Sequence, residues 1–195
     1  MVATLVEGQG EVAALPVLLR RMAAETAPDV WLDLPRPYRL GRGSLLAPHG
    51  VERAVAALAE QGGPAAGLLV LLDADDDCPA ELATALLPRV GATRPGGRNS
   101  VVVANREFEA WFLAAAPSLQ GKRGLAADLP QPADPELPRD CKGWLSRHRI
   151  DGHDYKPTAD QAALAAAFDL RLARKNSPSF DKLWRDVDRM LREAA

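Results

Sequence analysis

The amino-acid sequence predicts an α/β fold with a mainly parallel sheet that is covered by helices on both faces. The first observation is a pair of short apolar runs, Leu68–Leu72 and Ser100–Ala104, which suit strands buried on both faces of a parallel sheet. The second is that predicted strands and helices alternate along the first 116 residues. The length of 195 residues suits one domain that buries a sizeable core.

The first predicted strand is Val2–Val6, and the turn Glu7–Glu11 joins it to a helix. Apolar residues at helical spacing indicate this helix, namely Val12, Leu15, Leu18, Leu19 and Met22. Pro16 fits only near the first turn of a helix, so we expect that the helix starts late or bends.

A second strand is predicted at Val30–Leu34, where Pro35 and Pro37 end it. The loop after this strand carries Arg36, Arg39 and Arg42. These basic side chains are either solvated loop charges or a patch that faces phosphate groups.

The remaining elements continue the alternation and then depart from it. We predict a helix over 51–61, a strand over 68–72, a helix over 80–87, a Gly/Pro/Arg loop over 91–99, a strand over 100–104 and a helix over 106–116. The segment 117–158 holds six of the 16 prolines and many basic residues, which is typical of a functional insertion or of a partly mobile loop. Two helices within 159–195 are expected to pack on the 1–116 core.

The charge balance limits the possible partners. Lys and Arg number 24 against 26 Asp and Glu, which gives a net charge of −2, so no overall basic field attracts nucleic acid. Two cysteines are too few for a disulfide framework, and no apolar run approaches the ~18 residues of a membrane helix. A cytoplasmic protein is therefore expected, and the sequence leaves its oligomeric state open, a homo-oligomer included.

Four carboxylates, Asp73, Asp75, Asp76 and Asp77, follow the third predicted strand directly. Ligands bind at the carboxyl edge of open α/β sheets. Like charges a few Å apart raise one another's pKa unless a cation offsets them, and Mg²⁺ takes carboxylate oxygens. The turn therefore indicates either a metal site or an acidic cap for the helix that starts near Pro79.

The turn after the first strand matches a dinucleotide-binding pattern. Residues 8–13 satisfy G-x-G-x-x-A, and Asp33 lies where a ribose-binding acid belongs. However, Glu7 and Glu11 would direct two carboxylates at the pyrophosphate. A metal site uses these acids, so a dinucleotide-binding Rossmann protein is kept only as an alternative.

Several segments carry a resemblance to known families. They are Val6-Glu7-Gly8 with Glu11, Asp73-x-Asp75, Glu107–Ala114, Tyr155-Lys156, Phe168–Arg171 and Ser177–Leu183. The first two resemble the Toprim domain of topoisomerases, primases and the overcoming-lysogenization-defect nucleases. The full set is similar to a bacterial Toprim-like family known as domain of unknown function 4276. The resemblance implies a Toprim-like, Rossmann-like fold and a Mg²⁺-dependent nuclease that often acts with a separate ATPase, with a role in phage defence among the expectations.

The residues of such a site follow from the chemistry of phosphodiester cleavage, in which two metal ions are bridged by carboxylates. Asp73 and Asp75 would bind Mg²⁺ or Mn²⁺, and Glu11 would complete the site. Glu7 would act either as a ligand or as a general acid/base, and Glu109 either as a further ligand or as an acid behind the ligands.

Substrate binding would fall to cations outside the acidic cluster. Lys156 would position the scissile phosphate of a DNA or RNA substrate, and Arg36, Arg39 and Arg42 would bind neighbouring phosphates. Two other classes of function stay open: a phospho-acceptor pocket in which one Asp takes a phosphoryl group, and a non-catalytic subunit that docks on an ATPase.

Overall fold

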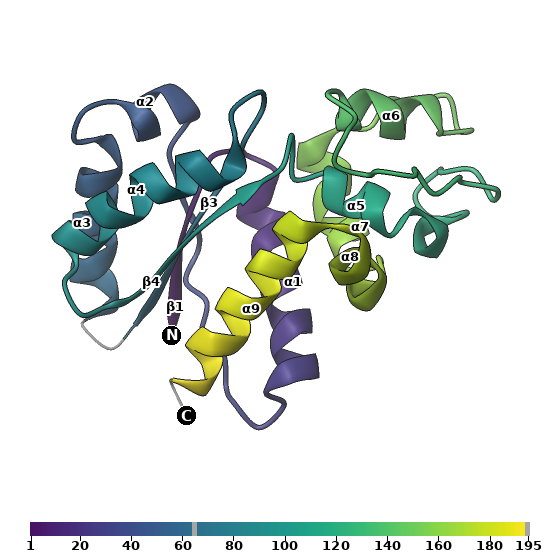
Figure 1. The fold of residues 1–195 in the computed structure, drawn as a ribbon. Helices are drawn as coiled ribbons and strands as arrows, with labels where there is room; N and C mark the ends of the chain where they lie inside the picture. The colour runs from purple at the N-terminus through teal and green to yellow at the C-terminus, as the bar shows by residue number, and fades with distance from the viewer. Residues whose placement is uncertain (64–65, 194–195) are drawn as a thin grey trace.

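The computed structural model describes residues 1–63 and 66–193, in which four parallel strands form one sheet (Figure 1). Its strands are β1 (Val2–Val6), β2 (Tyr38–Arg39), β3 (Gly67–Asp73) and β4 (Arg98–Ala104), in the spatial order β2-β1-β3-β4. Val6 of β1 pairs with Leu71 of β3, which in turn pairs with Val102 of β4. The predicted α/β class with a mainly parallel sheet is confirmed.

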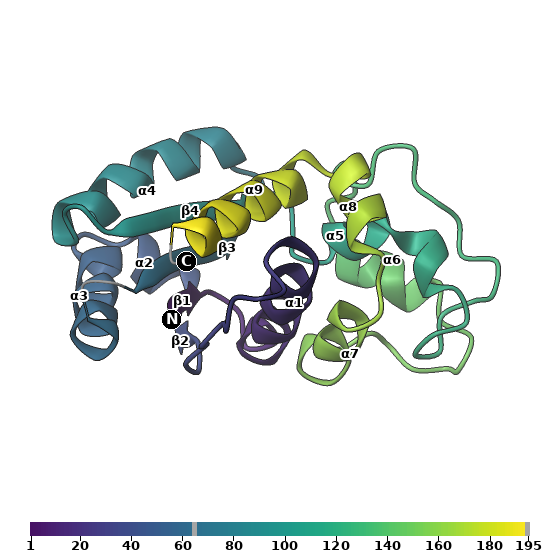
Figure 2. The same ribbon diagram turned by 90° about the horizontal axis from the view of Figure 1, so that it is seen from below.

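Helices cover both faces of the sheet (Figure 2). They are α1 (Glu11–Thr26), α2 (Arg42–Leu46), α3 (Gly50–Gly62), α4 (Pro79–Thr93), α5 (Ala110–Ala114), α6 (Cys141–Arg147), α7 (Ala162–Ala165), α8 (Leu170–Asn176) and α9 (Pro178–Arg192), with the short turns η1 (Ala116–Leu119) and η2 (Pro157–Gln161). In β3, Leu69 and Leu71 pack with α1 and α9, whereas Leu68, Val70 and Leu72 pack with α3 and α4. The run at 68–72 is apolar throughout because both faces of its strand are buried.

The second strand was predicted at the wrong place. Residues 30–34 are irregular and make one backbone contact with the sheet, in which Val2 N–H donates to the Asp33 carbonyl at 2.9 Å. Trp31 is 90% exposed, which does not suit a buried strand. Pro35 and Pro37 have no amide N–H, so pairing resumes only after them, at β2.

Several helix boundaries differ from the predictions. Helix α1 begins at Glu11 without delay and contains Pro16, and α4 runs on to Thr93, so the connection to β4 is shorter than the predicted 91–99 loop. The predicted helix 106–116 is reduced to α5, since residues 105–109 form a turn in which Arg106 has a positive φ of 63°. The first closing helix is divided into α7 and α8, whereas α9 has the predicted cap, with Ser177 accepting from Phe180 N–H.

The segment 117–158 is mostly irregular and includes α6. Asp140 caps α6 by accepting a hydrogen bond from Gly143 N–H. Leu125, Leu129 and Tyr155 are buried in the same core cluster as α1 and α5. This segment is therefore folded against α1 and α5, and it shares the core on the side of the sheet that α1 and α9 cover. None of the helices in the described residues is both long and apolar enough to cross a membrane.

Candidate metal centre

The acids predicted as metal ligands lie at the carboxyl edge of the sheet. Glu7 follows β1, Asp73 ends β3, and Glu11 is the first residue of α1. Because β1 and β3 are parallel neighbours, their carboxyl ends meet at one edge. A cavity of about 370 Å³ opens there, lined by Glu7, Gly8, Gln9, Gly10, Glu11, Asp73, Asp75, Lys142, Pro157, Thr158 and Gln161. Four of the five predicted ligands thus line one cavity.

The turn before α1 holds Glu11 in a fixed position. Gly8 N–H donates to Glu11 Oε2 at 2.8 Å, and a Cβ on Gly8 would lie 2.5 Å from Glu11 Oε1. A Cβ on Gly10 would lie 2.2 Å from Gln161 Oε1 and 2.8 Å from the Pro157 Cβ. Close packing inside the protein accounts for both glycines of the dinucleotide-like pattern.

Lys142 places a positive charge among three acids of this site. Its ammonium Nζ lies 2.7 Å from Glu107 Oε1, 3.2 Å from Glu109 Oε2 and 4.0 Å from Asp73 Oδ2. Its backbone N–H also donates to Glu107 Oε2 at 3.0 Å. The sequence had grouped Lys142 with the other basic residues of 117–158 and had given the positioning role to Lys156. Lys142 lies 35 residues from Glu107 in the sequence, at the start of the short helix α6, and no periodic signal there would have indicated this contact.

Glu109, the fifth predicted ligand, is fully buried behind the cavity. Its Oε1 accepts hydrogen bonds from Tyr155 Oη at 2.9 Å and from Gln161 Nε2 at 3.1 Å. Its Oε2 has the ion-pair contact with Lys142 and no hydrogen-bond partner among the described residues. Gln161 was missed in the sequence, whereas Tyr155 was noticed only as part of a family motif.

Arg42 contacts the acids on the other side of the site. Its guanidinium lies 3.7 Å from Glu7 Oε2 and 3.5 Å from Asp75 Oδ2, and it also pairs with Asp77 and donates to the Asp73 carbonyl. Asp75 is more than half exposed and has a left-handed φ of 53° in the turn after β3. Arg42 therefore neutralises the acidic turn.

The other predicted phosphate-binding residues lie apart from this network. Arg36 and Arg39 are exposed before α2. Lys156 is exposed, and its backbone N–H donates to Asp160 Oδ2 at 3.0 Å. In residues 1–63 and 66–193 the Lys156 ammonium makes no contact with the acids at the cavity, whereas the Lys142 ammonium does.

Burial raises the pKa of the carboxyl groups at this edge. It raises the pKa of Glu11 to about 7, with a further increase from the charges of Glu109 and Glu7. It raises the pKa of Asp73 well above its usual range, and Glu11 and Glu109 add to that increase. The pKa values of Glu7 and Glu109 are also raised by burial, against the opposing charges of Arg42 and Lys142 respectively. The acids thus repel one another in the folded protein, and a further cation would stabilise their charged forms.

The donor set suits a hard cation by its chemistry. Among the described residues, three oxygens at this site are buried and have no hydrogen-bond partner, namely Glu7 Oε2, Glu109 Oε2 and Gln161 Oε1. Carboxylate and amide oxygens are the ligands that Mg²⁺ and Mn²⁺ take. However, no three His, Cys, Asp or Glu side chains in the described parts of the chain are arranged to hold a metal ion. The protein's own cations, Lys142 and Arg42, stand among the acids instead.

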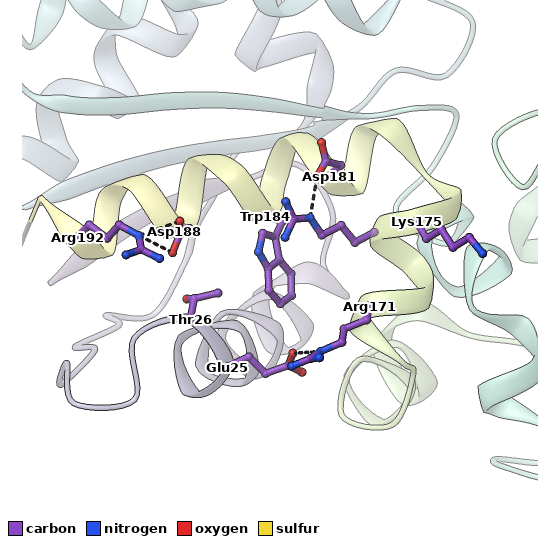
Figure 3. A pocket seen from close by; sticks show the side chains of 9 residues that line it. Glu25, Thr26, Arg171, Lys175, Asp181, Trp184, Asp188 and Arg192 are labelled. Atoms are coloured by element: carbon purple, nitrogen blue, oxygen red, sulfur yellow. Dashed lines mark hydrogen bonds and ion pairs between the residues drawn. The ribbon is translucent and has the colours of Figure 1, made fainter.

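A larger cavity, of about 600 Å³, lies between the end of α1 and helices α8 and α9 (Figure 3). Its arginines are paired with acids: Arg171 with Glu25, Arg174 with Asp181, and Arg192 with Asp188. No residue that the sequence predicted for the site lines it. Because its arginines are already paired and none of the predicted site residues lines it, the acidic cavity is the better candidate for the functional site.

The fold and the site together define an α/β protein with a buried cluster of acids at the carboxyl edge of a parallel sheet. The family model described as "Domain of unknown function (DUF4276)" matches residues 6–188. The chain therefore belongs to this family, as the motifs in the sequence predicted. No curated protein and no solved structure matches the chain.

Proposed function

We propose that this protein is a Toprim-type nuclease that hydrolyses phosphodiester bonds of DNA or RNA with Mg²⁺ or Mn²⁺. The observation that carries the proposal is the convergence of Glu7, Glu11, Asp73 and Glu109, from three separate parts of the chain, on one edge of the sheet with raised pKa values. Holding so many acids close together costs stability unless the site binds a cation.

Each acid has a role that its position supports. Asp73 and Glu7 line the cavity beside Lys142 and Arg42 respectively, and they would hold the metal together with Asp75 at the exposed mouth. No three acids in the described residues are arranged to hold a metal ion, so metal binding would have to draw these three side chains together. The metal, when bound, polarises the phosphoryl oxygen and lowers the pKa of a water molecule. The pKa of Glu11 lies at about 7, so this carboxyl can hold or release a proton near neutral pH, as a general acid/base must.

Substrate binding would depend on local cations and on a partner. Arg36 and Arg39 are exposed and could therefore meet phosphates, whereas Arg42 would have to leave its acids. With a net charge of −2, binding by the isolated chain should be weak and should fall steeply with salt. A separate ATPase that binds nucleic acid would supply the missing affinity.

The test is a cleavage assay in Mn²⁺ with plasmid DNA, single-stranded DNA and total tRNA, with and without an ATPase encoded beside the gene. We expect Asp73→Asn and Glu7→Gln each to abolish degradation. Glu60→Gln, which removes an exposed acid of α3 away from the site, should leave it unchanged. Activity that persists in both site variants would come from a contaminant and would contradict the proposal.

A second candidate is a non-catalytic subunit of an ATPase complex. The observation that favours it is that Lys142 and Arg42 already neutralise much of the acidic cluster, as in a structural ion-pair network. Metal binding separates the two candidates. A purely structural network predicts no rise in melting temperature with Mg²⁺ or Mn²⁺, whereas a metal bound only by the native state adds RT ln(1 + [M]/Kd) to stability.

A dinucleotide site is less favoured, because Glu11, Pro157 and Gln161 fill the space beside Gly8 and Gly10.

A further inference from the structure

Lys142 belongs to the segment 117–158, yet its side chain reaches the centre of the acidic site. We infer that its ammonium is an internal counter-ion that occupies the acidic site without metal and must be displaced when a divalent cation binds. This inference rests on the proposed metal site and concerns how that site is regulated.

The contacts of the ammonium support this role. It lies within 4.0 Å of carboxylate oxygens from Asp73, Glu107 and Glu109, which come from β3 and from the turn before α5. Glu109 is fully buried, and its Oε2 has no other polar partner in the described residues. A divalent cation bound to Asp73 or Glu109 would share these carboxylates with the Lys142 ammonium. Two cations bound to one carboxylate lie only a few Å apart and repel each other.

The structure also provides a way for the ammonium to leave without unfolding the segment that carries it. The backbone N–H of Lys142 donates to Glu107 Oε2, and Asp140 caps the same helix through Gly143 N–H. Both contacts are independent of the ammonium. The Lys142 side chain is 36% exposed and lines the 370 Å³ cavity, so its four-carbon stem can turn into the cavity while α6 stays docked.

Displacement would move a positive charge from the acids to the place where a phosphate group would lie. Lys142 lines the same cavity as Glu7, Glu11 and Asp75. An ammonium released there is a point charge that suits phosphate oxygens. Binding of the metal and recruitment of an anionic substrate would then be coupled through one side chain.

The first experiment compares the Mn²⁺ affinity of the full chain with that of Lys142→Met by calorimetry in EDTA-treated protein. Methionine keeps an unbranched stem and removes the charge, so we expect about tenfold tighter binding, the change that 1.4 kcal/mol of relieved repulsion would give. Lys122→Met, which removes an exposed lysine of the same segment, should leave the affinity unchanged. Equal affinity in wild type and Lys142→Met would overturn the inference alone, whereas the lack of Mn²⁺ binding in both proteins would overturn the proposed metal site itself.

A second measurement addresses displacement directly in the wild-type protein. An ammonium held by three carboxylates reacts slowly with an amine-acylating reagent, so Mg²⁺ should increase acylation of Lys142 several-fold, read by mass spectrometry of peptides. Lys122 serves as the internal reference, whose acylation should not change. Acylation of Lys142 that stays constant or falls on addition of Mg²⁺ would show that the ammonium is not displaced.

Removal of the charge can also unfold the metal-free protein, because Glu109 would be left without a cation. Lys142→Met is therefore paired with the double variant Lys142→Met/Glu107→Gln. The amide oxygen introduced by Glu107→Gln can still accept the backbone N–H of residue 142, and one acid fewer is left unpaired. The double variant should bind Mn²⁺ more tightly than Glu107→Gln alone. Equal affinity of these two variants would contradict competition between the ammonium and the metal.

Discussion

Glu11 offers the sharpest test of the cost of holding a charged acid in this cluster, because it is buried and its carboxyl accepts one defined hydrogen bond. Its Oε2 accepts from Gly8 N–H at 2.8 Å, and burial raises its pKa, with a further increase from the charges of Glu109 and Glu7. In Glu11→Gln the amide oxygen can accept the same hydrogen bond, while the negative charge is lost. The substitution therefore removes the buried charge and its repulsion by the neighbouring acids, and it keeps the packing.

The size and sign of the effect follow from linkage between proton binding and folding. The pKa of Glu11 is about 7 in the folded protein and 4.5 without the fold. Below pH 4.5 both states hold the proton, and between pH 4.5 and 7 only the folded state does, so stability falls as the pH rises through this window. Above pH 7 the loss is constant at about 3 kcal/mol. Glu11→Gln should recover this free energy at pH 8 and gain nothing at pH 4.

The assay is denaturant unfolding of the metal-free protein at pH 4 and pH 8, supported by thermal melts. A gain of about 3 kcal/mol corresponds to roughly 6–12 °C in melting temperature for a protein of this size. Glu60→Gln is the matched control and should not change stability at either pH. A gain that is absent at pH 8, or that is equal at the two pH values, would refute the electrostatic explanation.

Two further substitutions test the packing and the hydrogen bonds of the site. Gly10→Ala should destabilise the fold by about 1–3 kcal/mol in urea unfolding, because its Cβ would overlap Gln161 and Pro157. The control is Gly91→Ala in α4, where a Cβ meets nothing within 4 Å, and it should be neutral or stabilising. Equal effects of the two substitutions on stability would argue against close packing around Gly10. Tyr155→Phe should cost about 1.5–3 kcal/mol at pH 8 because buried Glu109 loses a donor, and less at pH 4 where Glu109 is neutral. The chain's other tyrosine, Tyr38 on the exposed β2, gives the control Tyr38→Phe, and a loss for Tyr155→Phe that does not depend on pH would indicate lost packing instead.

The central strands and the acids at their ends could be predicted because both signals are local. The run at 68–72 has no polar residue, and Asp73 follows it directly, so the position of Asp73 at the edge follows from the strand itself. Glu7 follows β1 in the same way. The glycines of the turn after the first strand match a dinucleotide-binding pattern, but in the structure Gly8 and Gly10 make room for Glu11 and Gln161.

The remaining parts depend on contacts between distant segments. Val30–Leu34 has the composition of a strand, yet the prolines that follow it and the exposure of Trp31 place it outside the regular sheet. Lys142 meets Glu107 across 35 residues, and nothing in its neighbours along the chain distinguishes it from Lys156. Which of these lysines contacts the acids is determined by the tertiary structure and not by the local sequence.

The second half of the chain is needed for the acids to be held where they are. Residues 1–116 supply Glu7, Glu11, Asp73 and Glu109, with Arg42 on one side of them. The groups that satisfy buried Glu109, which are Lys142, Tyr155 and Gln161, all come from later in the chain. An unpaired buried carboxylate costs several kcal/mol, so Glu109 could not stay charged and buried without them. The segment 117–158 therefore does more than connect two parts of the fold, because it supplies the cation and one of the hydrogen-bond donors that allow a cluster of acids to exist at the edge of the sheet.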